Sequence, residues 1–189
     1  VRSFLLDGRQ AGLTPEALDR RRILIGPNGA TSLLESLALL IRRGVVLVAD
    51  PMYYIYCDYL QRLGLEVVAV PEDGEGMSAD GLRRALDDLD QRRDDVGFIY
   101  VITVHNPTGT ILSNRRRGEL RRIAAELSTA LGRRVPLVLD RAYEDLIHDP
   151  TVERPRSVLA DDEDGIVYEV GTLAKILAPG LRIGYMVAP

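Results

Sequence analysis

The sequence predicts an α/β protein in which helices cover both faces of a mostly parallel sheet. Short runs of apolar, β-branched residues recur along the chain, as is typical of buried strands. Stretches with the apolar spacing of helices lie between these runs. Strands that alternate with helices in this way indicate a parallel sheet with helices on its two faces.

The predicted strands are short and apolar. None of the runs approaches the roughly 18 residues that a membrane-spanning helix needs. The strands are expected at residues 23–25, 45–49, 65–70, 97–104, 135–139, 166–170 and 183–187.

The predicted helices have recognisable ends. The first begins near Ala30 and ends before Gly44, and the second follows Ser78, a candidate N-cap. The third follows Ser113, another candidate cap, and stops at Gly132, a usual C-terminal signal. These ends place each helix between two predicted strands.

Two charged runs are expected at the surface. Arg115, Arg116 and Arg117 fall near the start of the third helix, where positive charge is unfavourable for the helix dipole. A solvated face is the expected setting for them, with a contact to another group as the alternative. The acidic run 161–165 is expected to be a solvated turn ahead of a strand.

Composition narrows the function classes. At 189 residues, with 46% hydrophobic and 28% charged residues and a net charge of -4, the chain has the size and balance of one globular domain. The chain has no polybasic stretch of the kind that binds nucleic acid, so no nucleic-acid partner is expected. It also has no segment that predicts a membrane partner. The lone Cys57 cannot form an internal disulfide, which favours a reducing, cytoplasmic compartment. His105 and His148 lack Cys or carboxylates at ligand spacing, so no metal site is expected.

Polar segments follow the predicted strands. In an open α/β sheet, ligands bind at the carboxyl ends of the strands, so these segments are expected to converge in space. The first of them, GPNG, lacks the G-x-G-x-x-G spacing of a dinucleotide site, which argues against a nicotinamide enzyme. The segments are GPNGAT after strand 23–25, DPMY after 45–49, HNPTG after 97–104, DRAY after 135–139 and GTLAK after 166–170.

Lys175 stands out by composition. Of the 24 Lys and Arg residues, it is the only lysine. Surface charge does not explain it, because arginine fills that role everywhere else in the chain. Unlike a guanidinium, a lysine amine can lose its proton and attack a carbonyl carbon. The alternative is a surface lysine that escaped an arginine-rich codon bias.

Taken together and in this order, the polar segments and Lys175 resemble the large domain of the fold type I pyridoxal-phosphate enzymes, in particular the class I and II aminotransferases. The resemblance covers nearly all of the chain. It implies a three-layer αβα fold with a mostly parallel, mixed sheet, and it assigns residues 1–189 to the large domain that binds pyridoxal 5'-phosphate. The family's amino-terminal segment and carboxyl-terminal small domain have no counterpart, so we expect the chain to be an excerpt of a longer protein.

The resemblance implies catalytic roles. Lys175 matches the family's Schiff-base lysine, which also moves a proton between the substrate Cα and the cofactor C4'. Asp140 matches the carboxylate that keeps the cofactor ring nitrogen protonated, with a simple Asx turn as the alternative. Tyr143 and Asn106 match the groups that bond the cofactor's phenolic oxygen; the alternatives are a half-buried ring and a turn residue.

The resemblance also implies a stacking ring and an anion site. Tyr53 matches the aromatic residue that stacks on the cofactor, although the nearby tyrosines could instead pack a helix core. The helix that begins near Ala30 offers its first amides to a phosphate. The residues that match the phosphate site are Gly29, Ala30, Thr31, Thr172 and Arg182.

The implied function is transfer of an amino group from an amino acid to a 2-oxo acid by a ping-pong route. A homodimer is expected by analogy with the family. No residue can be assigned to the substrate α-carboxylate, because the family's arginine for it lies in the small domain. The alternatives are a β-lyase, an aminocyclopropane-carboxylate-synthase-like enzyme, or a cofactor-binding effector domain of a transcription regulator that has no catalytic turnover.

Overall fold

The computed structural model describes residues 1–7, 11–41 and 44–189. These residues form an 8-stranded sheet in the order β1-β8-β7-β6-β5-β2-β3-β4. The strands are β1 (Arg22–Pro27), β2 (Val45–Asp50), β3 (Glu66–Asp73), β4 (Gly76–Met77), β5 (Val96–Ile102), β6 (Leu137–Asp140), β7 (Val167–Thr172) and β8 (Ile183–Ala188).

The sheet is mixed and mostly parallel, as predicted. The strands β3, β2, β5, β6 and β7 are parallel neighbours. At one end β8 runs antiparallel to both β7 and β1, and at the other β4 runs antiparallel to β3. Because β1 and β7 flank the reversed β8, the carboxyl ends of β1, β7, β6, β5 and β2 all lie along the same edge of the sheet. The polar segments that follow these strands therefore converge.

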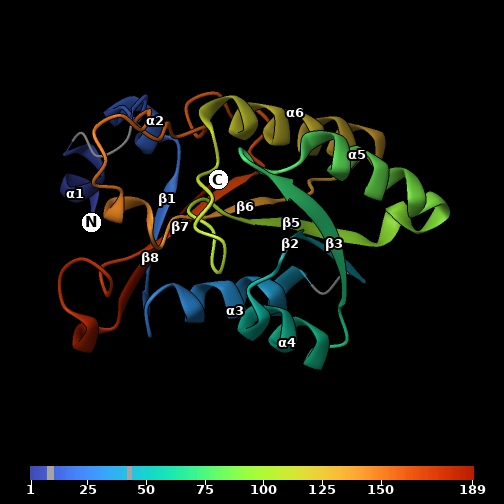
Figure 1. Ribbon diagram of the computed structural model, residues 1–189, viewed down its shortest axis with the longest axis horizontal. Helices are drawn as coiled ribbons and strands as arrows, with labels where there is room; N and C mark the ends of the chain where they lie inside the picture. Colours follow the sequence, from blue (N-terminus) through green and yellow to red (C-terminus); the bar gives the residue numbers. More distant parts are fainter. Residues whose placement is uncertain (8–10, 42–43) are drawn as a thin grey trace.

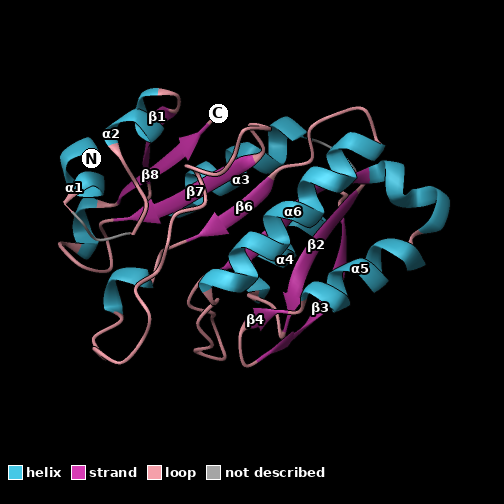
Figure 2. Cartoon of the chain, turned by 90° about the horizontal axis from the view of Figure 1, so that it is seen from above, coloured by secondary structure: helices cyan, strands magenta, loops and turns pink. Residues whose placement is uncertain are grey.

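Helices form a layer on each face of the sheet. On one face lie α3 (Ala30–Ile41) and α4 (Tyr54–Arg62), and on the other lie α5 (Ala79–Asp88) and α6 (Asn114–Ala130) (Figure 1). Figure 2 shows the same layers from above. The short helices α1 (Arg2–Leu6) and α2 (Pro15–Asp19) join the side of α5 and α6. The predicted αβα sandwich is thus confirmed.

The hydrophobic core has two parts, one on each face of the sheet, because side chains along each strand point alternately to the two faces. On β5, Ile99 and Val101 pack with the α5 and α6 layer, whereas Phe98 and Tyr100 pack with the α3 and α4 layer. Side chains of successive strand residues point to opposite faces, so a fully buried strand supplies both clusters. Every residue of β5 is buried, which explains its continuous apolar sequence.

The predicted helix ends are confirmed. The Ser78 hydroxyl accepts a hydrogen bond from the Gly81 amide at 3.1 Å, and the Ser113 hydroxyl accepts one from the Arg116 amide at 3.1 Å. Both are N-cap bonds that satisfy an amide without a partner inside its own helix. Gly132 follows α6 with a φ of 61°, the left-handed conformation that glycine adopts without strain.

Some elements were not predicted. β4, α1 and α2 are too short to give a periodic signal, and strand 97–104 ends earlier, at Ile102. Short 3-10 helices also follow several elements: η1 (Asp90–Asp95), η2 (Glu144–Leu146) and η3 (Pro179–Leu181). Within the described ranges, each helix is either too short or too polar to cross a lipid bilayer.

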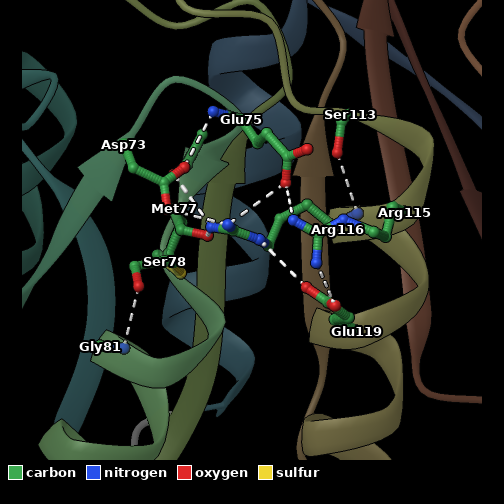
Figure 3. A network of polar contacts seen from close by, with 10 residues as sticks. Asp73, Glu75, Met77, Ser78, Gly81, Ser113, Arg115, Arg116 and Glu119 are labelled. Carbon is green, nitrogen blue, oxygen red and sulfur yellow. Dashed lines mark hydrogen bonds and ion pairs between the residues drawn. The ribbon is translucent and has the colours of Figure 1, made fainter.

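Arg116 corrects the expectation of a solvated arginine run. Its side chain is only 6% exposed and lies between α6 and the β3–β4 hairpin (Figure 3). The guanidinium donates to Asp73 at 2.9 Å, to Glu119 at 3.2 Å and to the Met77 carbonyl. Its partners in the hairpin supply acceptors for the guanidinium, so the alternative of a contact holds for Arg116. Arg115 alone is exposed as expected, and it pairs with Glu75 and Glu119.

The acidic run 161–165 is also only partly solvated. Asp162 is buried, and its carboxylate accepts hydrogen bonds from the amides of Ile166 at 3.1 Å and Val167 at 3.0 Å. Arg21 lies 3.3 Å from the same carboxylate. A carboxylate that satisfies two backbone amides at the start of a strand has a structural role, so the solvated-turn expectation is wrong for Asp162.

Candidate active site

A cavity of about 180 Å³ opens at the carboxyl edge of the sheet. The polar segments after β1, β2, β5, β6 and β7 all contribute to its wall, together with Arg182, which directly precedes β8. All the site residues proposed from the sequence line it. They are Gly29, Ala30, Thr31, Tyr53, Asn106, Asp140, Tyr143, Thr172, Lys175 and Arg182.

Asp140 is the buried carboxylate of the cavity. It ends β6 and is only 6% exposed. The Tyr100 hydroxyl donates to its Oδ2 atom at 2.8 Å, and the Ala142 amide donates to its Oδ1 atom at 2.9 Å. Burial raises the pKa of Asp140, and the two donors oppose that rise. The bond to Ala142 is the Asx turn that was the alternative for Asp140. Asp140 forms this turn and also lines the cavity.

Lys175 and Tyr143 meet across the cavity. Lys175 follows β7 with its side chain exposed, and Tyr143 is half-buried after β6. The Nζ atom of Lys175 lies 5.2 Å from the centre of the Tyr143 ring, within the range of a cation–π contact. The positive charge of Lys175 also lowers the pKa of Asp140, although less than the hydrogen bonds to Asp140 do. The amine, the phenol and the carboxylate thus share one site.

Arg182 and the amino terminus of α3 lie together where β1 leads into α3 and form a positive region of the cavity wall. The Nη2 atom of Arg182 donates to the Asn28 side chain at 3.0 Å, and among the described residues no carboxylate lies within ion-pairing distance of Arg182. The first-turn amides of α3, at Ala30 and Thr31, have no acceptor within their own helix. An uncompensated guanidinium beside a helix amino terminus is suited to binding an anion.

Gly29 contributes shape rather than a donor to this anion site. Its amide donates to the Arg182 carbonyl at 2.9 Å, so the expected use of this amide for the anion is not available in this conformation. Its φ is +69°, and an added Cβ would lie 3.2 Å from the Thr172 Oγ1 atom and 3.5 Å from Arg182 Nη2. Glycine therefore keeps the space between Thr172 and Arg182 open.

The Thr172 hydroxyl is already bonded within the protein. It donates to the Ile183 carbonyl at 3.1 Å and accepts from the Ala174 amide at 3.1 Å. These bonds tie the end of β7 to the start of β8 and orient the turn that carries Lys175. Thr172 thus organises the cavity wall that it lines.

Asn106 lies in a closed turn after β5. The turn is closed by backbone bonds from His105 to Thr110 at 2.8 Å and from Gly109 to His105 at 2.7 Å. The His105 ring is buried, with Nδ1 3.2 Å from Glu72 and 3.1 Å from Thr108. Burial lowers the pKa of His105, and Glu72 opposes that shift. His105, the residue before Asn106, therefore anchors this turn.

The tyrosines after β2 separate into different roles. Tyr53 is the N-cap residue of α4, is half-buried and lines the cavity. Tyr56 and Cys57 are buried in the core beneath it, and Tyr54 is 73% exposed. Burial raises the pKa of the Tyr53 hydroxyl. The helix-core alternative thus holds for Tyr56, whereas Tyr53 lies on the cavity wall, and Cys57 is buried as expected.

A buried ionic cluster lies behind the segment that carries Asp140 and Tyr143. Glu144 accepts from Arg141 at 2.8 Å and also from Arg117, which is fully buried. Arg141 also lies 3.4 Å from Glu169. Burial alone would raise the pKa of Glu144, but Arg141 and Arg117 hold it at about 2. The solvated-face expectation is therefore wrong for Arg117 as well.

Tyr100, which bonds Asp140 from behind the cavity wall, was not singled out from the sequence. It lies within β5, where a tyrosine looks like one more apolar core residue. Its hydroxyl is the available signal, because a buried tyrosine usually needs a hydrogen-bond partner.

Among the described residues, no three His, Cys, Asp or Glu side chains gather as metal ligands do.

Comparison with known proteins places the chain in a family. Residues 13–189 match the family model described as "Aminotransferase class I and II". The chain is 32% identical over 145 residues to aromatic-amino-acid aminotransferase 1 of Thermococcus litoralis, covering 76% of this chain and 33% of that protein. It is 32% identical over 187 residues to YisV of Bacillus subtilis, an uncharacterized HTH-type transcriptional regulator, covering 97% of this chain and 35% of that protein.

The fold agrees with solved structures. An archaeal alanine:glyoxylate aminotransferase superposes with a TM-score of 0.81 at 30% identity, covering 99% of this chain and 44% of that one. Pyrococcus horikoshii kynurenine aminotransferase superposes with a TM-score of 0.78 at 26% identity, covering 96% of this chain and 42% of that one. The chain therefore spans less than half the length of these relatives. On its sequence and its fold, the chain belongs to the class I and II aminotransferase family.

Proposed function

We propose that residues 1–189 are the cofactor-binding large domain of a pyridoxal-phosphate-dependent aminotransferase that passes an amino group from an amino acid to a 2-oxo acid. One observation carries the proposal. The only lysine of the chain lines the same cavity as Asp140, Tyr143, Asn106 and Arg182. Family membership and the convergence of five separate segments support this interpretation.

The residues of the cavity suit the chemical groups of pyridoxal phosphate. Arg182 and the start of α3 would hold the phosphate, with Gly29 leaving room for it. Asp140, a buried carboxylate, would face the ring nitrogen. Tyr53 offers a flat apolar ring for stacking. When bound, the cofactor supplies an electron sink for the carbanion formed at the substrate Cα.

The protein's own groups would then hold and move protons. Lys175 would bind the cofactor aldehyde through its amine and, once released, carry a proton from the substrate Cα to the cofactor C4'. Asp140 would keep a proton on the ring nitrogen. Tyr143 and Asn106 would donate to the phenolic oxygen and so set the proton affinity of the site. Thr172 would keep the turn before Lys175 in place.

An assay on the full-length protein tests this function. Amino acids are added one at a time to the protein with pyridoxal phosphate, and the absorbance of the cofactor and the released products are followed. An aminotransferase converts the cofactor to its amine form, releases a 2-oxo acid, and recovers the first absorbance when a different 2-oxo acid is added. Release of ammonia would instead identify a β-lyase or an aminocyclopropane-carboxylate-synthase-like eliminase.

The names of the relatives favour one second candidate, the effector domain of a transcription regulator. YisV, YdfD of Bacillus subtilis and YjiR of Escherichia coli are all named as uncharacterized HTH-type regulators, at 32%, 29% and 33% identity. A regulator would show the bound-cofactor absorbance without releasing any product. A homodimer is the assembly proposed for either function, and sedimentation of the full-length protein tests it.

A further inference from the structure

Tyr100 and Asp140 form a buried hydrogen bond between neighbouring strands. The Tyr100 hydroxyl donates to Asp140 Oδ2 at 2.8 Å, and the two side chains come from β5 and β6. Tyr100 is 2% exposed and Asp140 6% exposed. A hydrogen bond to a charged acceptor in a dry environment is stronger than one between neutral groups.

The position of the Tyr100 hydroxyl is fixed by packing. Its ring meets the Tyr56 ring edge-on, with centroids 4.8 Å apart. The Tyr56 hydroxyl in turn donates to the Leu34 carbonyl at 2.9 Å, so α4 and α3 hold the stack against the sheet. Tyr100 therefore has little freedom to move away from Asp140. This constraint makes its hydroxyl a stable part of the carboxylate's surroundings.

The bond opposes the cost of burying the Asp140 charge. Burial raises the pKa of Asp140, and the Ala142 amide and the Tyr100 hydroxyl lower it. Glu144 raises it further, and Lys175 lowers it. The titratable groups that interact with Asp140 come from β5, α4, the segment after β6 and the turn after β7. They are Tyr100, Tyr53, Tyr56, Glu144 and Lys175.

We propose that Tyr100 is a positioning residue, whose hydroxyl keeps the Asp140 carboxylate ionised and oriented toward the ring nitrogen of the cofactor. The inference rests on the function proposed above, because it assigns Asp140 to that nitrogen. Tyr100 itself does not line the cavity, so it acts only through Asp140. The second carboxylate oxygen keeps its bond to Ala142, so Tyr100 controls Oδ2 alone.

The test compares two cofactors with the full-length protein. One is pyridoxal phosphate, and the other is its carbocyclic analogue, in which a C–H group replaces the ring nitrogen. Affinities are measured for wild type, Tyr100→Phe and Tyr185→Phe. Tyr185→Phe is the matched control, because it also removes one buried tyrosine hydroxyl, but one on β8 that is not among the groups that shift the pKa of Asp140. Circular dichroism establishes that each variant is folded.

Tyr100→Phe is expected to weaken binding of pyridoxal phosphate by about tenfold, since a hydrogen bond to a charged group is lost. Binding of the carbocyclic analogue is expected to change less than about twofold, because Asp140 then faces no ring nitrogen. In Tyr185→Phe, the affinities for the two cofactors are expected to change by the same factor.

The possible outcomes separate this inference from the proposed function. An equal loss for both cofactors in Tyr100→Phe, or no loss for either, overturns the role of Tyr100 and leaves the proposed function standing. A wild-type protein that forms no borohydride-reducible adduct with pyridoxal phosphate overturns the proposed function, and this inference with it. If Tyr100→Phe does not fold, Tyr100→His, which keeps a ring and a donor, is expected to restore folding and preferential binding of pyridoxal phosphate; equal binding of both cofactors by this variant overturns the inference.

Discussion

The ammonium of Lys175 lies over the ring of Tyr143, with its Nζ atom 5.2 Å from the ring centre. The two residues follow different strands, β7 and β6, and meet only because parallel strands end along one edge of the sheet. Asp140 lies at the end of that same β6 strand. A residue singled out by composition alone thus lies beside two residues singled out by their position after a strand.

Tyr143→Phe tests the bond to the cofactor's phenolic oxygen. Without the donor, that oxygen becomes more basic and retains a shared proton to higher pH, so the pH midpoint of the bound cofactor's absorbance should rise. A pH titration of the absorbance measures this midpoint. Tyr54→Phe is the control, since Tyr54 is 73% exposed and does not line the cavity. An unchanged midpoint in Tyr143→Phe would contradict the assigned role.

Asp140→Asn tests the buried carboxylate. A neutral amide cannot favour a proton on the ring nitrogen, so the first-order rate of amino-acid conversion in a single turnover should fall by roughly a hundredfold or more. The fold should persist, because the amide has the same shape and needs no buried charge. Asp149→Asn, at an exposed turn, serves as the control. A rate within a few-fold of wild type would rule out this role for Asp140.

Glu144→Ala tests the buried ionic cluster. The variant leaves Arg117 and Arg141 buried without their shared carboxylate, so the free energy of unfolding should fall by about 3–5 kcal/mol. Glu126→Ala breaks the exposed pair with Arg83 and should cost less than about 1 kcal/mol. Urea unfolding measures both. Equal losses of unfolding free energy in the two variants would show that the buried cluster stabilises the fold no more than an exposed ion pair does.

The same cluster predicts a pH dependence of stability. Arg141 and Arg117 lower the pKa of Glu144 from its ordinary value of 4.5 to about 2, so the folded state favours the ionised form. This contribution is fully present above pH 4.5 and is lost as the pH falls toward 2. Acid titration of unfolding should therefore show a steeper loss of stability in wild type than in Glu144→Gln. Parallel curves would contradict the prediction.

Gly184→Ala tests the junction between β8 and the anion site. An added Cβ would overlap the Gly29 carbonyl oxygen, so the two backbones must separate. We expect a loss of stability of roughly 1–3 kcal/mol or more, with weaker phosphate binding. Gly118→Ala, in α6 with open space around it, should instead stabilise by about 0.5–1 kcal/mol. Thermal unfolding and phosphate titration distinguish the two. A neutral Gly184→Ala would show that the close approach is not required.

The sequence was informative wherever a signal is local. Strand periodicity and caps such as Ser78 and Ser113 depend on neighbours within a few residues, and the structure confirms them. Hydrogen-bond and ion-pair partners that lie far apart along the chain could not be predicted from the sequence. Arg116 bonds Asp73 across 43 residues, Arg117 bonds Glu144 across 27, and Tyr100 bonds Asp140 across 40. Burial of an arginine or use of a tyrosine hydroxyl is decided by those distant partners.

The most direct test of the account is to find which residue carries the cofactor. The full-length protein is incubated with pyridoxal phosphate, reduced with borohydride, digested and analysed by mass spectrometry. The cofactor mass should appear on the peptide that contains Lys175, and Lys175→Arg should lose the adduct while keeping its circular dichroism spectrum. Labelling at another amine, or an adduct that persists in Lys175→Arg, would contradict the central claim.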